Sequence, residues 1–245
     1  MDVPAEESNG QVEFLVASAA PEDWRRAAED ARLSEELALV LLQHRQLDAE
    51  TVALLAQRQA LLKDHRVLQA VVAHPSTPRH VSLPLLNRLF TLELLRLTLM
   101  PAVKADIRID CERRILARLE GASLGEKMTL AKQATGGVAS VLLLSPEEAV
   151  ASAALNNYHL TEAEVLKALR REVVPQGFFR QLMQHGKWRT RLEVQAAMLS
   201  HGALPLDCAR SIVAAAPPSF LQQVVRQRRP RPEVQRLIAA RTGKN

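Results

Sequence analysis

The chain has 245 residues, of which 47% are hydrophobic and only 3% aromatic. Leu, Ala and Val dominate the apolar residues, and nine glycines leave little material for the turns of a β-sandwich or barrel, so we expect an all-α protein. The net charge of +5 is uneven, because residues 1–120 carry 15 Lys and Arg against 18 Asp and Glu, whereas residues 121–245 carry 17 against 9. This imbalance favours an anionic partner for the second half.

The first residues are acidic and polar, and they lack the basic region and apolar stretch of a signal peptide. We expect a disordered segment over residues 1–11, one helical-repeat domain over 12–240 and a frayed basic tail over 241–245. No apolar run reaches the roughly eighteen residues that span a bilayer. Cys111 and Cys208 lie far apart within predicted helices, which is typical of reduced thiols. These features predict a cytoplasmic protein that does not enter a membrane.

Five segments of the chain share one pattern, and they begin at His44, His74, Glu120, Asn157 and His201. Each has an apolar or small residue three positions after the first, then a helix-starting residue and apolar positions at helical spacing. The intervals of 30, 46, 37 and 44 residues predict degenerate two-helix repeats with irregular periods near forty. We expect the His or Asn side chain at the first position to bond the backbone of its turn.

Several of these segments carry the chemistry of a helix start. Asp48, Thr161 and Asp207 are suited to accept bonds from backbone N–H groups in a first helical turn. Glu164 completes a capping box with Thr161. Thr77 before Pro78 predicts a Thr cap with Pro at the first helical position. Each start therefore predicts a helix whose apolar stripe packs on a neighbouring helix.

Partner helices are expected between these starts, and the pair Gly136-Gly137 predicts a helix C-cap. The predicted partner helices cover residues 93–99, 107–119, 147–155, 176–185 and 188–199.

Further motifs carry a family resemblance over roughly residues 30–215. They are AHPSTP at 73–78, SLGEK at 123–127, ALNN at 154–157 with LTE at 160–162, WRTR at 188–191 and AAML at 196–199. In these motifs the chain resembles the HEAT-like and leucine-rich-repeat-variant α-solenoids of bacterial proteins. The resemblance implies a right-handed α-solenoid of stacked HEAT-like helix pairs with a general binding role. Some leucine-rich-repeat-variant proteins hold a cysteine-ligated iron–sulfur cluster, but this chain lacks those cysteines, so we expect no cofactor.

A phosphate-binding loop is not predicted, although residues 121–129, GASLGEKMT, superficially resemble one. Three residues rather than four separate the glycines, Glu126 stands between Gly125 and Lys127, and no strand precedes the segment. The segment instead predicts a helix-to-helix turn with Lys127 in the first turn of the next helix.

Neither metal binding nor catalysis is expected. His44, His74 and His201 occupy equivalent positions of the predicted repeat, so one solenoid step of roughly 8–10 Å separates them, too far to share an ion. No nucleophile elbow or paired-carboxylate motif is present. HEAT-repeat DNA glycosylases show that such a fold can be an enzyme, but the aromatic residues that their clefts use are sparse in this chain.

Basic segments near the C-terminus are the main functional lead. The candidate contacts for phosphate or an acidic partner are Lys187, Arg189, Arg191, Arg226, Arg228, Arg229 and Arg231. One interpretation is nucleic-acid binding through phosphates. The interpretation that we prefer is a solubilising cap on the terminal repeat, because aromatic stacking platforms are missing and arginines of this kind are common on soluble domains.

The sequence thus favours a non-enzymatic helical-repeat scaffold that binds another protein through a helix or peptide. The alternative is a nucleic-acid-binding module that uses the basic C-terminal half, and a remote alternative is an enzyme of the DNA glycosylase type. The oligomeric state stays open.

Overall fold

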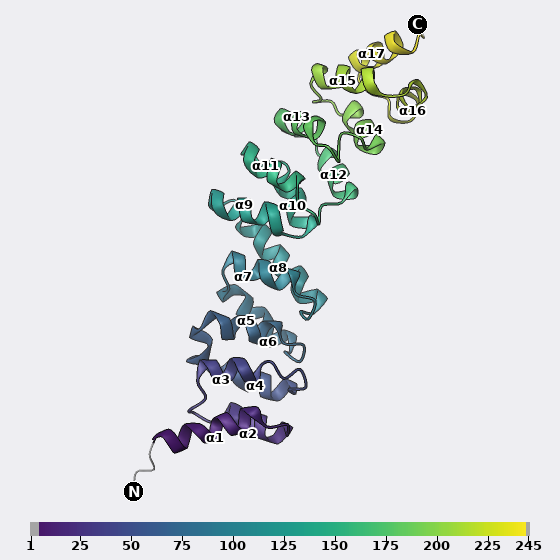
Figure 1. The fold of residues 1–245 in the computed structure, drawn as a ribbon. Coiled ribbons are helices and arrows are strands. Elements are labelled where there is room, and N and C mark those ends of the chain that lie inside the picture. Colours follow the sequence, from purple (N-terminus) through teal and green to yellow (C-terminus); the bar gives the residue numbers. More distant parts are fainter. Residues whose placement is uncertain (1–4, 244–245) are drawn as a thin grey trace. The chain divides into compact units, whose positions relative to one another are not determined.

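A computed structural model of the chain describes residues 5–243, and this part is all-helical (Figure 1). It contains 17 α-helices and the 3-10 helices η1 (Leu61–Lys63) and η2 (Leu86–Arg88), with no strand. The prediction of an all-α protein is confirmed. Residues 1–4 of the expected disordered segment and residues 244–245 of the expected tail lie outside the described residues. No helix within residues 5–243 combines the length and the apolarity needed to cross a membrane.

The chain divides into two compact units, a first unit of Met1–Glu120 and a second unit of Gly121–Asn245. The predicted repeat domain of residues 12–240 covers parts of both units and stays a prediction. The first unit holds α1 (Ala5–Ala17), α2 (Pro21–Glu29), α3 (Glu35–Leu41), α4 (Ala49–Gln57), α5 (His65–Ala73), α6 (Arg79–Leu85), α7 (Thr91–Leu99) and α8 (Ala105–Arg118). The second unit holds α9 (Leu124–Gln133), α10 (Gly136–Leu142), α11 (Glu148–Leu155), α12 (Glu162–Leu169), α13 (Gln176–Gln184), α14 (Leu192–Ser200), α15 (Leu206–Ala215), α16 (Pro218–Arg228) and α17 (Pro232–Thr242).

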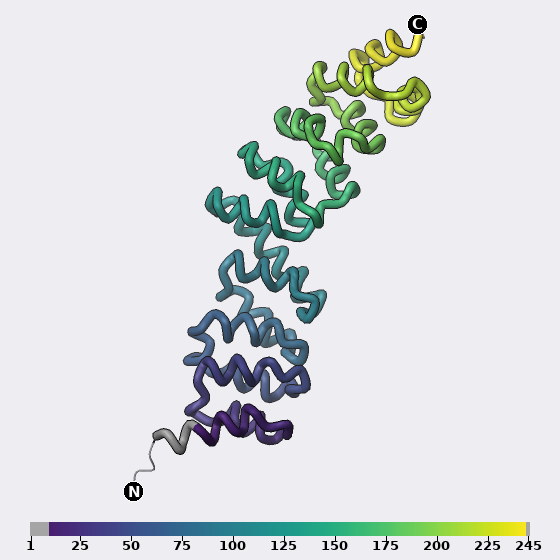
Figure 2. Tube along the Cα trace, in the orientation of Figure 1, coloured from purple at the N-terminus to yellow at the C-terminus, as the bar shows by residue number. Residues whose placement is uncertain are grey.

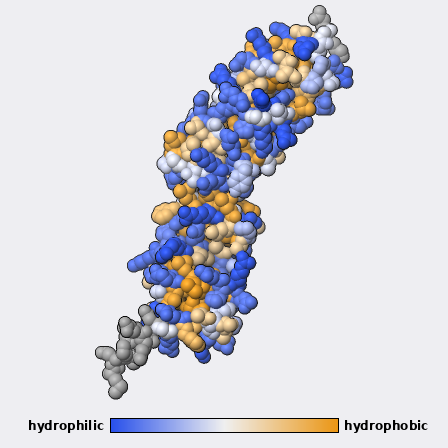
Figure 3. Space-filling view, viewed as in Figure 1, coloured by the Kyte–Doolittle hydropathy of each residue, from blue (hydrophilic) through white to orange (hydrophobic). Residues whose placement is uncertain are grey.

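Within each unit, successive helices reverse direction at short turns and pack in two rows (Figure 2). In the first unit, the odd-numbered helices α1, α3, α5 and α7 follow one another, while α2 packs on α4 and α6 packs on α8. In the second unit, α9, α11, α13, α15 and α17 form one row, and α10, α12, α14 and α16 form the other. Mostly sequential packing of this kind is typical of a helical repeat. The face seen in Figure 3 mixes hydrophobic and hydrophilic residues along both units.

A recurrent turn joins the rows. In six turns the carbonyl of one residue accepts the N–H of the residue three positions on, as between Asn157 and Leu160 at 3.1 Å. The residue that donates this N–H is buried in all six turns, which ties each turn to the core. The residue after it is the N-cap of the following helix. Four of the five segments found in the sequence therefore begin with this turn. The segment at Glu120 does not, because the Ser123 N–H donates to the Glu126 carboxylate. The six turns begin at Asp30, His44, His74, Met100, Asn157 and His201.

Two of the predicted helix starts are confirmed. The Asp48 carboxylate accepts the Thr51 N–H at 2.6 Å, and the Glu164 carboxylate accepts the Thr161 N–H at 2.7 Å. The Thr77 cap is wrong, because the Thr77 hydroxyl is buried and donates to the Val71 carbonyl of the preceding helix. Pro78 takes the N-cap position instead, in an extended conformation.

The predicted C-cap at Gly136-Gly137 is also wrong, since Gly136 begins α10. The preceding helix ends at Gln133 with Ala134 extended, so it needs no left-handed residue. Glycine serves a different purpose at this position, because a Cβ on Gly136 would lie 2.2 Å from both carboxylate oxygens of Glu164. The two helix starts at α10 and α12 are therefore packed against each other.

Four of the predicted partner helices, residues 93–99, 107–119, 147–155 and 176–185, correspond to α7, α8, α11 and α13 within two residues at each end. The fifth prediction, residues 188–199, begins too early, because α14 starts at Leu192. Trp188 lies in the turn before α14, where the wide indole fills the core between helices.

Hydrogen bonds between turns reveal the repeat period. On one edge of the first unit, the Nε2 atoms of His44 and His74 donate to the Val16 and His44 carbonyls at 3.0 and 3.2 Å, and Lys104 Nζ donates to the Thr77 carbonyl at 2.9 Å. These donors are 30 residues apart, so the predicted period near forty is wrong for this unit. The predicted bonding of the anchor side chain to the backbone of its own turn is confirmed for His74, Asn157 and His201. The His44 ring bonds only the earlier Val16 carbonyl among the described residues.

A second edge of the first unit carries an arginine ladder with the same spacing. Arg58 donates to the carbonyls of Ala28, Asp30 and Ala31 at 3.2, 2.6 and 3.0 Å. Arg88 donates to the Leu62 carbonyl at 2.9 Å, and Arg118 donates to the Leu89 carbonyl at 2.7 Å. Cationic side chains near helix C-termini satisfy carbonyls that have no partner within the helix. Each repeat thus caps the helix ends of the repeat before it.

Candidate functional site

The second unit contains all seven candidate contact residues, and the structure separates them into two groups. Lys187, Arg189 and Arg191 lie in the turn from α13 to α14, whereas the other four lie at the end of α16 and in the turn from α16 to α17. These turns connect the two rows in opposite directions, so they lie at opposite ends of the helices. The seven residues do not form one surface.

The first group belongs largely to the fold. Lys187 Nζ donates to the Leu160 carbonyl at 3.3 Å and lies 4.0 Å from the centre of the Trp188 ring. The indole is buried, and its N–H donates to the Leu155 carbonyl at 3.0 Å. Trp188 is therefore a core anchor and offers no face for stacking a base. Arg191 lies 3.9 Å from the Glu162 carboxylate. Of these three side chains, only that of Arg189 has no ion pair, hydrogen bond or ring contact with a described residue.

Two members of the second group also have internal partners. Arg231 is half-buried and donates to the carbonyls of Gly202, at 2.9 Å, and Leu204. It follows the His201 anchor by 30 residues, which is the period of the first unit. The Arg228 guanidinium pairs with the exposed Glu193 carboxylate at 2.7 Å. Arg231 thus caps a turn in the way that the arginine ladder does in the first unit, and Arg228 keeps an exchangeable, solvent-facing pair.

Arg226 and Arg229 remain without an ion pair to any residue between 5 and 243. Arg229 adopts a left-handed conformation, with φ 47° and ψ 64°, and ends α16. Both side chains are exposed, so both are open to an external anion.

Two arginines that lie near Arg228, Arg170 and Arg171, were not among the candidates from the sequence. They follow α12 directly, and the His201 Nε2 atom donates to the Arg171 carbonyl at 2.9 Å, which fixes their turn beside the turn of His201. His201 Nδ1 accepts the Ala203 N–H at 3.0 Å, so the ring is held from both sides. The available signal was the spacing, because Arg171, His201 and Arg231 are 30 residues apart.

An open hollow of about 510 Å³ lies between these turns. Arg170, Arg171 and Arg228 stand around it with Glu172, while its wall is largely small and apolar. Both Arg170 and Arg171 are exposed and form no ion pair within the described part of the chain. Such a hollow suits an apolar side chain that is flanked by carboxylates. The other lining residues are Leu169, Ala197, Ser200, His201, Gly202 and Ala203.

Metal-ligating side chains and thiols are dispersed or buried in the part of the chain that the structure describes. Across residues 5–243 no group of three His, Cys, Asp or Glu side chains is placed to hold a metal ion. Burial raises the pKa of the Cys111 thiol to about 12 and also raises the pKa of Cys208, so neither sulfur carries thiolate character near neutral pH. The segment around Lys127 is a helix-to-helix turn as predicted, and Lys127 pairs with Glu147 at 3.1 Å.

A scan of the sequence against protein-family models finds no match, and searches of curated proteins and of solved structures find none either. The geometry of the second unit is therefore the basis for a proposed function.

Proposed function

We propose that the chain is a non-enzymatic helical-repeat scaffold that binds another protein, with its helix pairs stacked as a right-handed HEAT-like α-solenoid. The observation that carries the proposal is the hollow beside Arg170, Arg171 and Arg228. The bound element is an acidic peptide or helix that places one apolar side chain in the hollow and carboxylates on the arginines. Repeat proteins commonly bind extended partners along such surfaces.

The chemistry of the hollow supports a protein partner. Guanidinium groups bind carboxylates with two parallel hydrogen bonds, and the apolar wall made by Leu169, Ala197 and Ala203 gives an anchor side chain a place to leave water. Arg228 can exchange its solvent-facing Glu193 partner for a carboxylate of the ligand. A net charge of +8 over residues 121–245 draws an acidic partner to this unit.

Fluorescence anisotropy tests the proposal with a labelled helical peptide that carries Leu on one face and Glu elsewhere. We expect binding of this peptide and no binding of its counterpart with Lys in place of Glu. The double variant Arg170→Glu, Arg171→Glu should weaken binding by about tenfold or more, which corresponds to about 1.4 kcal/mol. Arg210→Glu is the matched control, because Arg210 is an exposed arginine of α15 without an ion pair to a described residue. Equal binding of both peptides, or an equal loss in the control, would reject the proposal.

Nucleic-acid binding is the second candidate, and the observation in its favour is that several exposed arginines of the second unit, among them Arg170, Arg171, Arg226 and Arg229, form no ion pair with a described residue. The same assay with duplex and single-stranded DNA and RNA, at low and moderate salt, tests it. Phosphate contacts predict binding that falls steeply with salt and weakens in the variant Arg226→Ala, Arg229→Ala. Substitution serves better than removal of the C-terminal segment, because Val234 and Ile238 are buried in α17. No binding at low salt would eliminate this candidate.

A further inference from the structure

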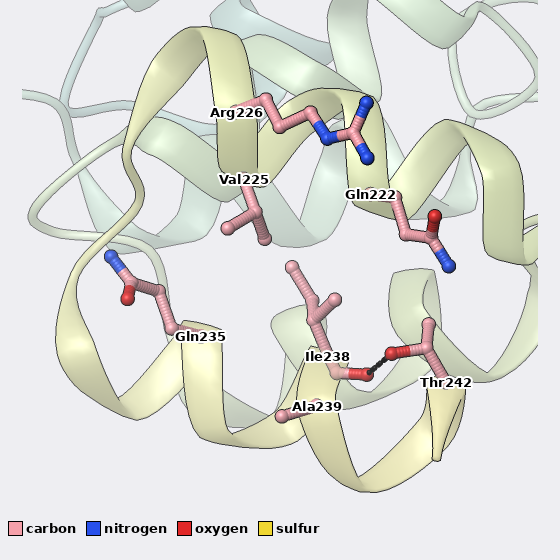
Figure 4. Close-up of a pocket in the computed structure, with 7 residues that line it drawn as sticks. All are labelled: Gln222, Val225, Arg226, Gln235, Ile238, Ala239 and Thr242. Atoms are coloured by element: carbon pink, nitrogen blue, oxygen red, sulfur yellow. Dashed lines mark hydrogen bonds between the residues drawn. The ribbon is translucent and has the colours of Figure 1, made fainter. Parts of the chain in front are cut away.

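A groove runs between α16 and α17, separate from the arginine-lined hollow (Figure 4). Its volume is about 260 Å³, and its lining residues recur three or four positions apart on both helices, so it follows the helix pair. Val225 and Ile238 point toward each other across it, with Ala239 beside them (Figure 4). No helix of the described chain covers this groove. The full lining is Gln222, Val225, Arg226, Gln235, Ile238, Ala239 and Thr242.

An exposed aromatic side chain lies on the first helix of the first unit. Val12 and Val16 of α1 are buried, whereas Phe14 is 71% exposed. A helical residue two positions from another points about 200° away from it, so Phe14 is directed away from the core that holds the two valines. Terminal repeats need a polar outer face for solubility, so a large exposed apolar side chain there favours an interaction surface.

The charges of these two segments are complementary. The sequence of α1 contains the acidic residues Glu6, Glu7 and Glu13 and no Lys or Arg. The segment of α16 and α17 has Glu233 as its one acidic residue, against six arginines. Arg226 lines the groove and forms no ion pair with a described residue. The six arginines are Arg226, Arg228, Arg229, Arg231, Arg236 and Arg241.

We propose that the groove between α16 and α17 binds α1 of a second copy of this chain, with the Phe14 ring against Val225 and Ala239. A cavity of about 150 Å³ is enough for a benzene ring, so the ring fits the groove. Glu13, next to Phe14, then faces Arg226. The contact is head-to-tail, and each copy keeps one free Phe14 and one free groove, so copies can add at both ends. This surface is distinct from the one used by the proposed function.

Sedimentation equilibrium of the full chain tests the proposal over concentrations from low micromolar to several hundred micromolar. We expect an average mass that rises from the 27.1 kDa of one chain to beyond two chains, and that falls when salt is added. Phe14→Ser and Ala239→Glu should each abolish the rise. Val173→Ser is the control, because it removes an apolar side chain that is 86% exposed outside the groove.

A mixing experiment separates head-to-tail association from a symmetric dimer. Phe14→Ser keeps an intact groove and Ala239→Glu keeps an intact Phe14, so the equimolar mixture should form a species of twice 27.1 kDa that does not grow further. Circular dichroism shows whether both variants are folded, and Arg226→Glu, at an exposed position, replaces Ala239→Glu if that variant is not. A wild-type chain that stays at the mass of one copy, or a mixture that does, would overturn the proposal.

Discussion

The two units use similar cationic side chains for different purposes. In the first unit, Arg58, Arg88 and Arg118 all bind carbonyls of an earlier turn, and acidic residues outnumber basic ones. In the second unit, Lys187 and Arg231 do the same, but most of the other arginines face solvent without an ion pair to a described residue. Position in the repeat therefore separates a stabilising arginine from one that is free for a partner, and residue type does not.

The largest expected effect compares the two tryptophans. The Trp188 indole donates to a carbonyl 33 residues earlier, whereas the Trp24 indole donates to Ser18, only six residues away, at 2.8 Å. Trp188→Ala should lower the free energy of unfolding by about 3–5 kcal/mol, because a cavity opens between repeats and the Leu155 carbonyl loses its donor. Trp24→Ala should cost less, since its bond is local. Urea denaturation measures both.

Tyr158→Ala is the control for this comparison, because its side chain is 77% exposed. It should change the unfolding free energy by less than about 0.5 kcal/mol. A larger loss for Trp24→Ala than for Trp188→Ala would mean that the bond between repeats is not what makes Trp188 important.

A second comparison sets a ladder arginine against a free one. Arg58→Ala removes the donor to three carbonyls of the turn after α2, and should cost about 2 kcal/mol of unfolding free energy. Arg170→Ala should change stability by less than about 0.5 kcal/mol, because Arg170 is exposed and without an ion pair to a described residue. Equal losses in urea denaturation would contradict the division into structural and free arginines.

The sequence predicted what local chemistry determines. The helical class, the N-cap at Asp48 and the bonding of the His74 ring to its turn all depend on residues within a few positions, and all are confirmed. The predicted period was wrong because turns at opposite ends of the helices were counted as one series. Asn157 lies in the turn from α11 to α12, whereas His201 lies in the turn from α14 to α15, so the two are not equivalent. The arginine ladder escaped notice because its acceptors are backbone carbonyls 26 to 30 residues earlier, which have no signature in the sequence.

The candidate site shows the same division. The sequence located the basic segments. It could not show that Arg231 donates to the Gly202 carbonyl while Arg226 forms no ion pair with a described residue. Arg171 was missed because it becomes a neighbour of Arg228 only when the turns of α12, α14 and α16 come together.

A smaller effect on the free energy of unfolding comes from the anchor His74, and it depends on pH. Burial lowers the pKa of His74 below its ordinary value of 6.5, and Lys104 lowers it further, against the opposing influence of the His44 carbonyl. The unfolded ring then takes up a proton at a higher pH than the folded ring does. Its contribution to stability is complete above about pH 6.5 and is lost as the pH falls toward the lowered folded pKa.

His74→Asn should flatten this dependence, because Asn157 makes the same two kinds of bond in the second unit without titrating. Unfolding free energies measured between about pH 7.5 and 5.5 should therefore fall less in this variant than in the wild type. His80→Asn, at an exposed position, is the control and should leave the slope unchanged. An unchanged slope in His74→Asn would show that another group determines the acid sensitivity.

The smallest effect concerns the packing of two helix starts in the second unit, at Gly136 and Glu164. A methyl group on Gly136 would meet the Glu164 carboxylate, which also accepts the Thr161 N–H and hydroxyl, so the carboxylate must leave its cap. Loss of such a cap costs about 1 kcal/mol. Gly136→Ala should therefore destabilise the wild type by up to about 1 kcal/mol, although alanine is the better helix former.

In the Glu164→Ala background the same change should be neutral or stabilising, because no carboxylate remains to displace. A double-mutant cycle in urea measures the coupling, and a cost of Gly136→Ala that is equal in both backgrounds would show that the glycine is needed for a reason other than this contact.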